Sequence, residues 1–308
     1  MFKSKMLKLK HKANWLLTFG LFSITLAIIC TLYLLVYPSN QDSFAGSEYF
    51  KVPYFLFLCI TIFVAPITEE LSFRGGFNKS KSIRIISIIG LFVFLLISES
   101  LLLKTLMMIY IALLIVSFYK RPNTLVISLY VGNALLFSLF HLDLDQLFTI
   151  SSLQGFLYRF AFGFFSIWIC INFNLLKSII FHAAWNFVLM TLLSIGLFFP
   201  DETINQYEND MIKVTWQRAS KTSNSIVNFN TTNGNALEAQ DCDIIFLLKS
   251  TEWSLSSKDS IIDFVPTEPY MDYKIDMKIK DTSNTNQNLY SLVRQFLSES
   301  DLIKLRPN

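Results

Sequence analysis

Two adjacent carboxylates and a guanidinium lie in the middle of a strongly apolar stretch, IFVAPITEELSFRGGF, which spans residues 62–77. An ionised side chain near the bilayer centre costs at least about 2.5–3.5 kcal/mol, so such charges are rare there and usually face a polar interior. Glu70 and Arg74 are four residues apart and can pair on one helix face. Glu69 lies about 100° around the helix from Glu70, so it is left for another partner.

Two of the three histidines lie in other apolar stretches. His141 ends FSLFH, and His182 begins HAAWN, with Asn186 one helical turn later on the same face. Imidazole titrates near neutral pH. Together with the carboxylates, these side chains could activate a water molecule or bind a metal ion. A structural ion pair between helices, or the ion site of a transporter, would also account for the charges.

The elements that must position these residues are predicted to be transmembrane helices. The chain has 308 residues, of which 53% are hydrophobic and 16% are charged, against about 25% charged residues in soluble domains. A helix needs about 20 apolar residues to cross a bilayer. We predict seven spans, at residues 14–37, 53–77, 84–98, 104–119, 124–142, 148–171 and 177–199. The third and fourth are short and could instead form one re-entrant hairpin.

The distribution of lysine and arginine predicts how these spans are oriented. The N-terminus carries KSKMLKLKHK, and alternate loops are basic. The basic loop residues are Lys79, Lys81 and Arg84, then Lys120 and Arg121, then Lys177. By the positive-inside rule, the N-terminus is cytoplasmic and residues 200–308 are extracytoplasmic in a multi-pass cell-membrane protein. The net charge of +3 is too small to indicate a nucleic-acid partner, and the lipid bilayer is the expected surrounding.

The predicted fold class is an all-α, multi-pass transmembrane helical bundle with a small C-terminal α+β soluble domain. Residues 1–199 form the membrane domain and residues 200–308 the soluble one, where the composition becomes polar. In that tail, DIIFLLK, SIIDFVP and YKIDMKIK are predicted strands, and NLYSLVRQFLSES is a predicted amphipathic helix. The tail contains no histidine and no motif that indicates chemistry.

The segments EELSFRG, FSLFH and HAAWN resemble, in this order, the EExxxR, FxxxH and HxxxN motifs of the CPBP family. This family contains the type II CAAX prenyl endopeptidases and the bacteriocin-processing and immunity proteins. Each motif alone is weak, but the ordered set in apolar segments is more specific. The resemblance covers about residues 53–199. It implies an intramembrane endopeptidase that cleaves a peptide or protein substrate associated with the membrane.

The resemblance also implies roles for individual residues. Glu69 would be the general base that activates water, assisted by His141. Glu70 would pair with Arg74 and hold the second span in place. The apolar segments 84–119 separate the first motif from the second, more than is typical of the family. His141 also lies late in its span, so that span must tilt or enter deeply for the two motifs to meet.

The third motif would supply the residues that act on the carbonyl group of the substrate. His182 and Asn186 would polarise the scissile carbonyl and stabilise the oxyanion. The resemblance leaves open whether the enzyme is a metalloprotease or a glutamate-dependent protease. If zinc takes part, Glu69, His141 and His182 would be its ligands.

Other interpretations of the same sequence remain open. The chain could be a non-catalytic membrane scaffold or a bacteriocin-immunity protein with the same fold. It could also be a small ion-coupled transporter that uses Glu69 and His141, although transporters usually show internal repeats and none is evident. Gln154 and Arg159 either serve the structure or line a cavity. Asp143 and Asp145 are predicted to be solvated loop residues.

Overall fold

The computed structural model describes residues 14–36, 52–120, 122–142, 149–221, 226–230, 236–252, 264–268, 270–280 and 289–305. The predictions for the N-terminal lysines, Arg121, Asp143 and Asp145 lie outside these residues. The chain divides into two compact units. The first comprises residues 1–45 and 58–188, and the second residues 46–57 and 189–308. The boundary predicted at residue 199 remains a prediction.

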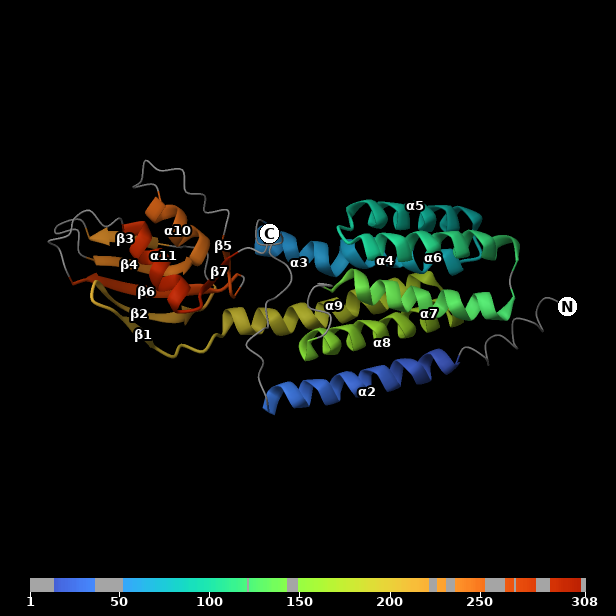
Figure 1. Cartoon of the computed structure of the whole chain (residues 1–308), viewed down its shortest axis with the longest axis horizontal. Coiled ribbons are helices and arrows are strands. Elements are labelled where there is room, and N and C mark those ends of the chain that lie inside the picture. The colour runs from blue at the N-terminus through green and yellow to red at the C-terminus, as the bar shows by residue number, and fades with distance from the viewer. Residues whose placement is uncertain are drawn as a thin grey trace. The chain divides into compact units, whose positions relative to one another are not determined.

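Each of the seven predicted spans contains a helix among the described residues (Figure 1). Within the described residues, six helices are long and apolar enough to cross a membrane, and α5, with 17 residues, is shorter. The number of membrane crossings therefore remains a prediction. The helices are α2 (Asn14–Val36), α3 (Tyr54–Cys59), the π-helix η2 (Ile60–Val64), α4 (Ala65–Phe73), the 3₁₀ turn η3 (Gly75–Phe77), α5 (Lys81–Ile97), α6 (Leu101–Tyr119), α7 (Asn123–Phe140), α8 (Ile150–Asn172) and α9 (Leu175–Phe198).

Small residues let neighbouring helices of the first unit approach closely. A Cβ at Gly163 of α8 would lie 2.9 Å from Ala134 Cα of α7, and a Cβ at Gly90 of α5 would lie 2.1 Å from Ser72 Oγ of α4. Such contacts are the usual basis of helix packing where the solvent is lipid. In the same unit α4 packs on α5, α5 on α6, α6 on α7, α7 on α8, and α8 on α2. Helices α5 and α6 are separate elements, joined at residues 98–100.

One continuous helix, formed by α3, η2 and α4, carries the first motif. Its middle turn is π-helical: the Ala65 amide donates to the Ile60 carbonyl, five residues back. The next residue in that pattern is Pro66, which has no N–H and cannot donate to the Thr61 carbonyl. The Asn186 side chain on α9 replaces this donor, with Nδ2 2.8 Å from Thr61 O. A π-turn inside a helix is uncommon and frequently marks a functional site.

The second unit contains a small antiparallel sheet and two short helices (Figure 1). The strand order is β1-β2-β6-β4-β3, and β5 pairs separately with β7. Alternate residues of the sheet are buried, so one face packs on the helices, as expected for α+β architecture. The elements are β1 (Asn205–Glu208), β2 (Ile212–Ala219), β3 (Ile226–Asn230), β4 (Ala236–Asp243), α10 (Ile244–Glu252), β5 (Phe264–Pro266), β6 (Asp272–Ile279), α11 (Leu289–Glu299) and β7 (Ile303–Leu305).

The element predictions for this tail have mixed outcomes. YKIDMKIK lies in β6 and NLYSLVRQFLSES in α11, so both predictions are confirmed. The described part of SIIDFVP is β5. The prediction of a strand for DIIFLLK is wrong, because β4 ends at Asp243 and α10 follows. Asp243 Oδ1 accepts a hydrogen bond from Phe246 N at 2.8 Å, which caps the helix.

Candidate active site

Glu70 is the centre of a buried polar cluster formed by α4, α8 and α9. Its side chain is fully buried, as is that of Arg74, whose Nη1 lies 3.4 Å from Glu70 Oε1. The Ser178 hydroxyl on α9 donates to Glu70 Oε2 at 2.6 Å, and His182 Nδ1 lies 3.1 Å from Glu70 Oε1. Arg74 also stacks over the Phe137 ring, with its guanidinium carbon 4.2 Å from the ring centre. Glu70 therefore joins the first and third motifs.

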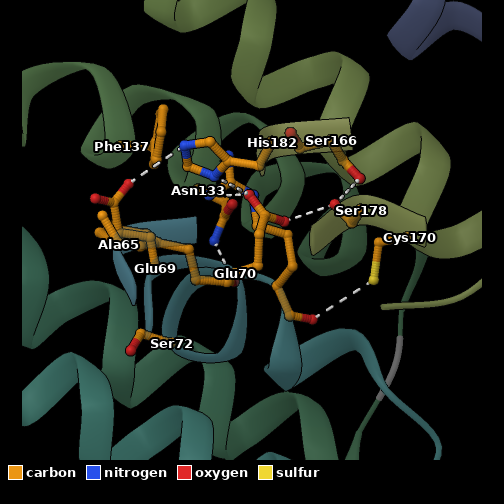
Figure 2. Close-up of polar contacts among 12 residues, drawn as sticks. Ala65, Glu69, Glu70, Ser72, Asn133, Phe137, Ser166, Cys170, Ser178 and His182 are labelled. Atoms are coloured by element: carbon orange, nitrogen blue, oxygen red, sulfur yellow. Dashed lines mark hydrogen bonds and ion pairs between the residues drawn. The ribbon is translucent and has the colours of Figure 1, made fainter. Parts of the chain in front are cut away.

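Glu69 faces a different set of atoms. Its Oε2 lies 3.5 Å from His141 Nε2 at the end of α7 and 3.9 Å from His182 Nε2 on α9. Figure 2 shows His182 between the two glutamates, with one ring nitrogen toward each. Glu69 Oε2 is buried and accepts no hydrogen bond from a described residue. Because Glu69 and His141 are 14% and 31% exposed while His182 is 5% exposed, the site opens on the side of His141.

The partners of the two histidines fix which ring nitrogen faces Glu69. His141 Nδ1 lies 2.8 Å from the Phe137 carbonyl oxygen, which can only accept, so Nδ1 carries the proton. His182 Nδ1 faces the Glu70 carboxylate in the same way. Both Nε2 atoms are then available toward Glu69. A carboxylate or carbonyl behind a histidine is a common way to orient a working imidazole.

The structure thus brings together five of the six predicted site residues. His141 lies at the end of α7, as its late position in the predicted span implied, and it still reaches Glu69. The sixth, Asn186, lies one turn beyond His182 on α9 and donates to the Thr61 carbonyl of η2. Its amide has a second N–H. In the described contacts, Asn186 therefore stabilises the helix that carries Glu69. Its role at the oxyanion remains a prediction.

Sequence reasoning missed several residues that support the site. Ser178 lies four residues before His182, and Asn133 lies four residues before Phe137, so each is on the same helix face as a motif residue. Asn133 is fully buried and donates to the Phe73 carbonyl at 2.6 Å and to the Tyr110 hydroxyl at 2.8 Å. The four-residue spacing of these polar residues in apolar helices was the signal that could have found them.

The sequence left open whether a zinc ion takes part, with Glu69, His141 and His182 as its ligands if it does. Among the described residues, no three His, Cys, Asp or Glu side chains are grouped closely enough to hold a metal ion. Glu69, His141 and His182 provide donors of the right chemical kind for zinc, but their present arrangement does not form a coordination shell.

Comparison with known proteins identifies the segment that carries this site. Residues 51–188 match the family model described as type II CAAX prenyl endopeptidase Rce1-like. This segment is Rce1-like. The family resemblance read from the three motifs is therefore confirmed, and the Rce1-like segment contains every predicted site residue. Searches of curated proteins and of solved structures found no match.

The match and the six apolar helices indicate an integral membrane protein, and residues 51–188 of it are similar to intramembrane proteases of the CAAX type. A peptide substrate follows from that protease class. The orientation of the termini, with the N-terminus cytoplasmic, remains a prediction.

Proposed function

We propose that this protein is an intramembrane endopeptidase in which the Glu69 carboxylate activates water for attack on a peptide bond. The observation that carries the proposal is the position of Glu69 Oε2, a buried acceptor between the Nε2 atoms of two histidines. Separations of 3.5 and 3.9 Å are too long for strong direct hydrogen bonds. A water molecule donating to Oε2 would lie within reach of both imidazoles, which is the arrangement expected of a general base with its water.

The reaction then follows from the protons that these groups can hold. Glu69 takes one proton from water while the water oxygen bonds to the scissile carbonyl carbon, and the carbonyl oxygen becomes an oxyanion. With protons on both ring nitrogens, His182 would donate Nδ1–H to Glu70 and Nε2–H to that oxyanion. Collapse of the tetrahedral intermediate breaks the C–N bond. The proton held by Glu69 passes to the leaving amine, which restores the carboxylate.

Glu70 would be a positioning residue in this scheme. It holds the His182 ring through Nδ1 and is itself fixed by Ser178 and Arg74. The three groups stabilise one negative charge in a site that excludes solvent. His141 would assist Glu69 from the open side, with its ring direction set by the Phe137 carbonyl.

The test is hydrolysis by the full-length protein in lipid nanodiscs, measured with a mixture of internally quenched apolar peptides. Glu69→Gln is expected to lower the rate at least about 100-fold, since it removes the general base, and to leave the melting temperature close to that of the wild type. Glu99→Gln, which changes an exposed glutamate outside the site, is the matched control. Equal rates for Glu69→Gln and Glu99→Gln would reject the proposal. Retained wild-type hydrolysis after chelator treatment would exclude the zinc-dependent alternative.

A further inference from the structure

Arg159 is a cation on α8 that neither the motifs nor the proposed reaction uses. It lies nine residues into a helix of 23 residues, between Tyr158 and Phe160. Its guanidinium folds back over Gly155: a Cβ at Gly155 would lie 2.8 Å from Arg159 Nη1 and 3.7 Å from Leu142 Cδ2. Leu142 directly follows His141. The guanidinium and the residue beside the catalytic histidine therefore flank the same glycine.

The helical positions also direct Arg159 toward the site. Gly155, Arg159, Phe162 and Ser166 are spaced by four, three and four residues, so they share one face of α8. The Phe162 ring lies 4.7 Å from the His182 ring and 5.6 Å from the Phe137 ring. The Ser166 carbonyl lies 3.0 Å from the Ser178 hydroxyl. Arg159 is thus one turn from a residue that packs directly on His182, on the face of α8 that lines the candidate site.

The neighbouring polar residues of α8 have structural partners, whereas Arg159 has none among the residues that the structure describes. Gln154 donates to Thr31 Oγ1 of α2 at 2.8 Å, and the Tyr158 hydroxyl lies 3.3 Å from the same atom. These contacts tie α8 to α2. Arg159 belongs to none of the ion pairs among the described residues, and its side chain is half-buried.

An arginine in an apolar helix is costly unless an anion or water satisfies it. A guanidinium presents parallel N–H donors that match a carboxylate in a two-point interaction. We propose that Arg159 binds a carboxylate of the peptide substrate, either its C-terminus or an acidic side chain close to the scissile bond. This inference rests on the proposed function and adds a specificity-determining residue to it. The helix face favours the substrate over a lipid phosphate, because it is the face that packs on His182 and Ser178.

The test measures binding separately from cleavage. The full-length Glu69→Gln variant in phosphatidylcholine nanodiscs is titrated with fluorescent apolar peptides in two matched pairs. One pair differs only in a free or amidated C-terminus, and the other in a central glutamate or glutamine. The same titrations are made with Arg159→Gln and Arg159→Lys added to that background. Lys81→Gln, which removes an exposed positive charge at the start of α5, is the matched control.

We expect the acidic member of one pair to bind about ten- to hundredfold more tightly than its neutral partner, the range of a charged hydrogen-bonded contact. Arg159→Gln should remove this preference, Arg159→Lys should retain only part of it, and Lys81→Gln should leave it unchanged. The pair that shows the preference identifies the source of the carboxylate. If Arg159→Gln does not fold, the partial loss in Arg159→Lys carries the test.

Three results would overturn the inference. They are the absence of a preference in both pairs, the absence of peptide binding, and an unchanged preference in Arg159→Gln. Recruitment of phosphatidylglycerol that depends on Arg159, without any peptide preference, would assign the residue to lipid instead. Failure of the proposed function has a different signature: the preference persists, but the protein with an intact Glu69 hydrolyses none of the peptides.

Discussion

The buried pair of Glu70 and Arg74 should couple strongly in a double-mutant cycle. Both side chains are fully buried, and Arg74 Nη1 lies 3.4 Å from Glu70 Oε1. Arg74→Met removes the cation and leaves the carboxylate with the Ser178 and His182 contacts. Glu70→Gln removes the anion and leaves the guanidinium over the Phe137 ring. In each single variant, one member of the ion pair remains buried without the other.

The structure sets the expected magnitudes. Removing one partner of a buried ion pair typically lowers the free energy of unfolding by about 3–5 kcal/mol. In Glu70→Gln, the contact of the desolvated Arg74 guanidinium with the Phe137 ring, at 4.2 Å, offsets up to about 2 kcal/mol of this loss. The double variant leaves no buried charge at either position, so its loss should be at least about 2 kcal/mol smaller than the sum of the two single losses.

The assay is equilibrium unfolding of the full-length protein in mixed micelles, followed by circular dichroism for all four members of the cycle. Losses that add to within about 0.5 kcal/mol would mean that the two residues do not interact. That result would refute the assignment of Glu70 as a charged group paired with Arg74, and with it the account of how His182 is positioned.

Three further predictions concern packing, the π-helix and the second unit. Gly90→Ala should lower the free energy of unfolding by about 1–3 kcal/mol, because the new Cβ overpacks against α4. The control Gly196→Ala, with no atom within 4 Å of the new Cβ, should leave the melting temperature unchanged or higher. Equal effects of the two variants would contradict the close approach of α4 and α5. Asn186→Ala should cost about 1 kcal/mol, because a carbonyl of η2 loses its donor, and an unchanged melting temperature would argue against that bond. A hydrogen bond from Lys280 and the nearby lysine charges lower the pKa of Glu208 below its ordinary value of 4.5, so this contact stabilises the fold above pH 4.5 and is lost as pH falls toward the lowered pKa. Lys280→Ala should move the Glu208 midpoint upward in an NMR titration, and an unmoved midpoint would exclude the pairing.

The helices of the first unit could be predicted because lipid imposes a simple requirement on sequence. An apolar run must be helical to satisfy its own backbone, so the run at 124–142 predicted α7 (Asn123–Phe140). The charged motif residues were equally visible, since an ionised side chain is conspicuous in such a run. The supporting hydroxyl of Ser178 was not, because serine is common in apolar helices and only its partner shows its role.

In the second unit, short apolar segments were ambiguous. DIIFLLK has the length and the branched residues of a strand, yet Ile244, Leu247 and Leu248 are buried on one helical face of α10. A run of this length has no decisive periodicity, and the cap by Asp243 decides the outcome locally. The π-helix was also beyond prediction, because Pro66 alone does not reveal that a side chain from another helix satisfies the carbonyl it leaves free.

The π-turn has a consequence for how insertions and deletions in this helix would be tolerated. It accommodates one more residue than an α-helical turn would, so deleting one residue between Ile60 and Val64 could restore a regular α-helix. Because the wider π-turn already absorbs the extra residue, the residues upstream would keep their direction relative to Glu69, whereas the Thr61 carbonyl would no longer be left free for Asn186. The extra residue thus exposes one backbone carbonyl to a side chain of α9 while the carboxylates that follow it keep the direction that an uninterrupted helix one residue shorter would give them.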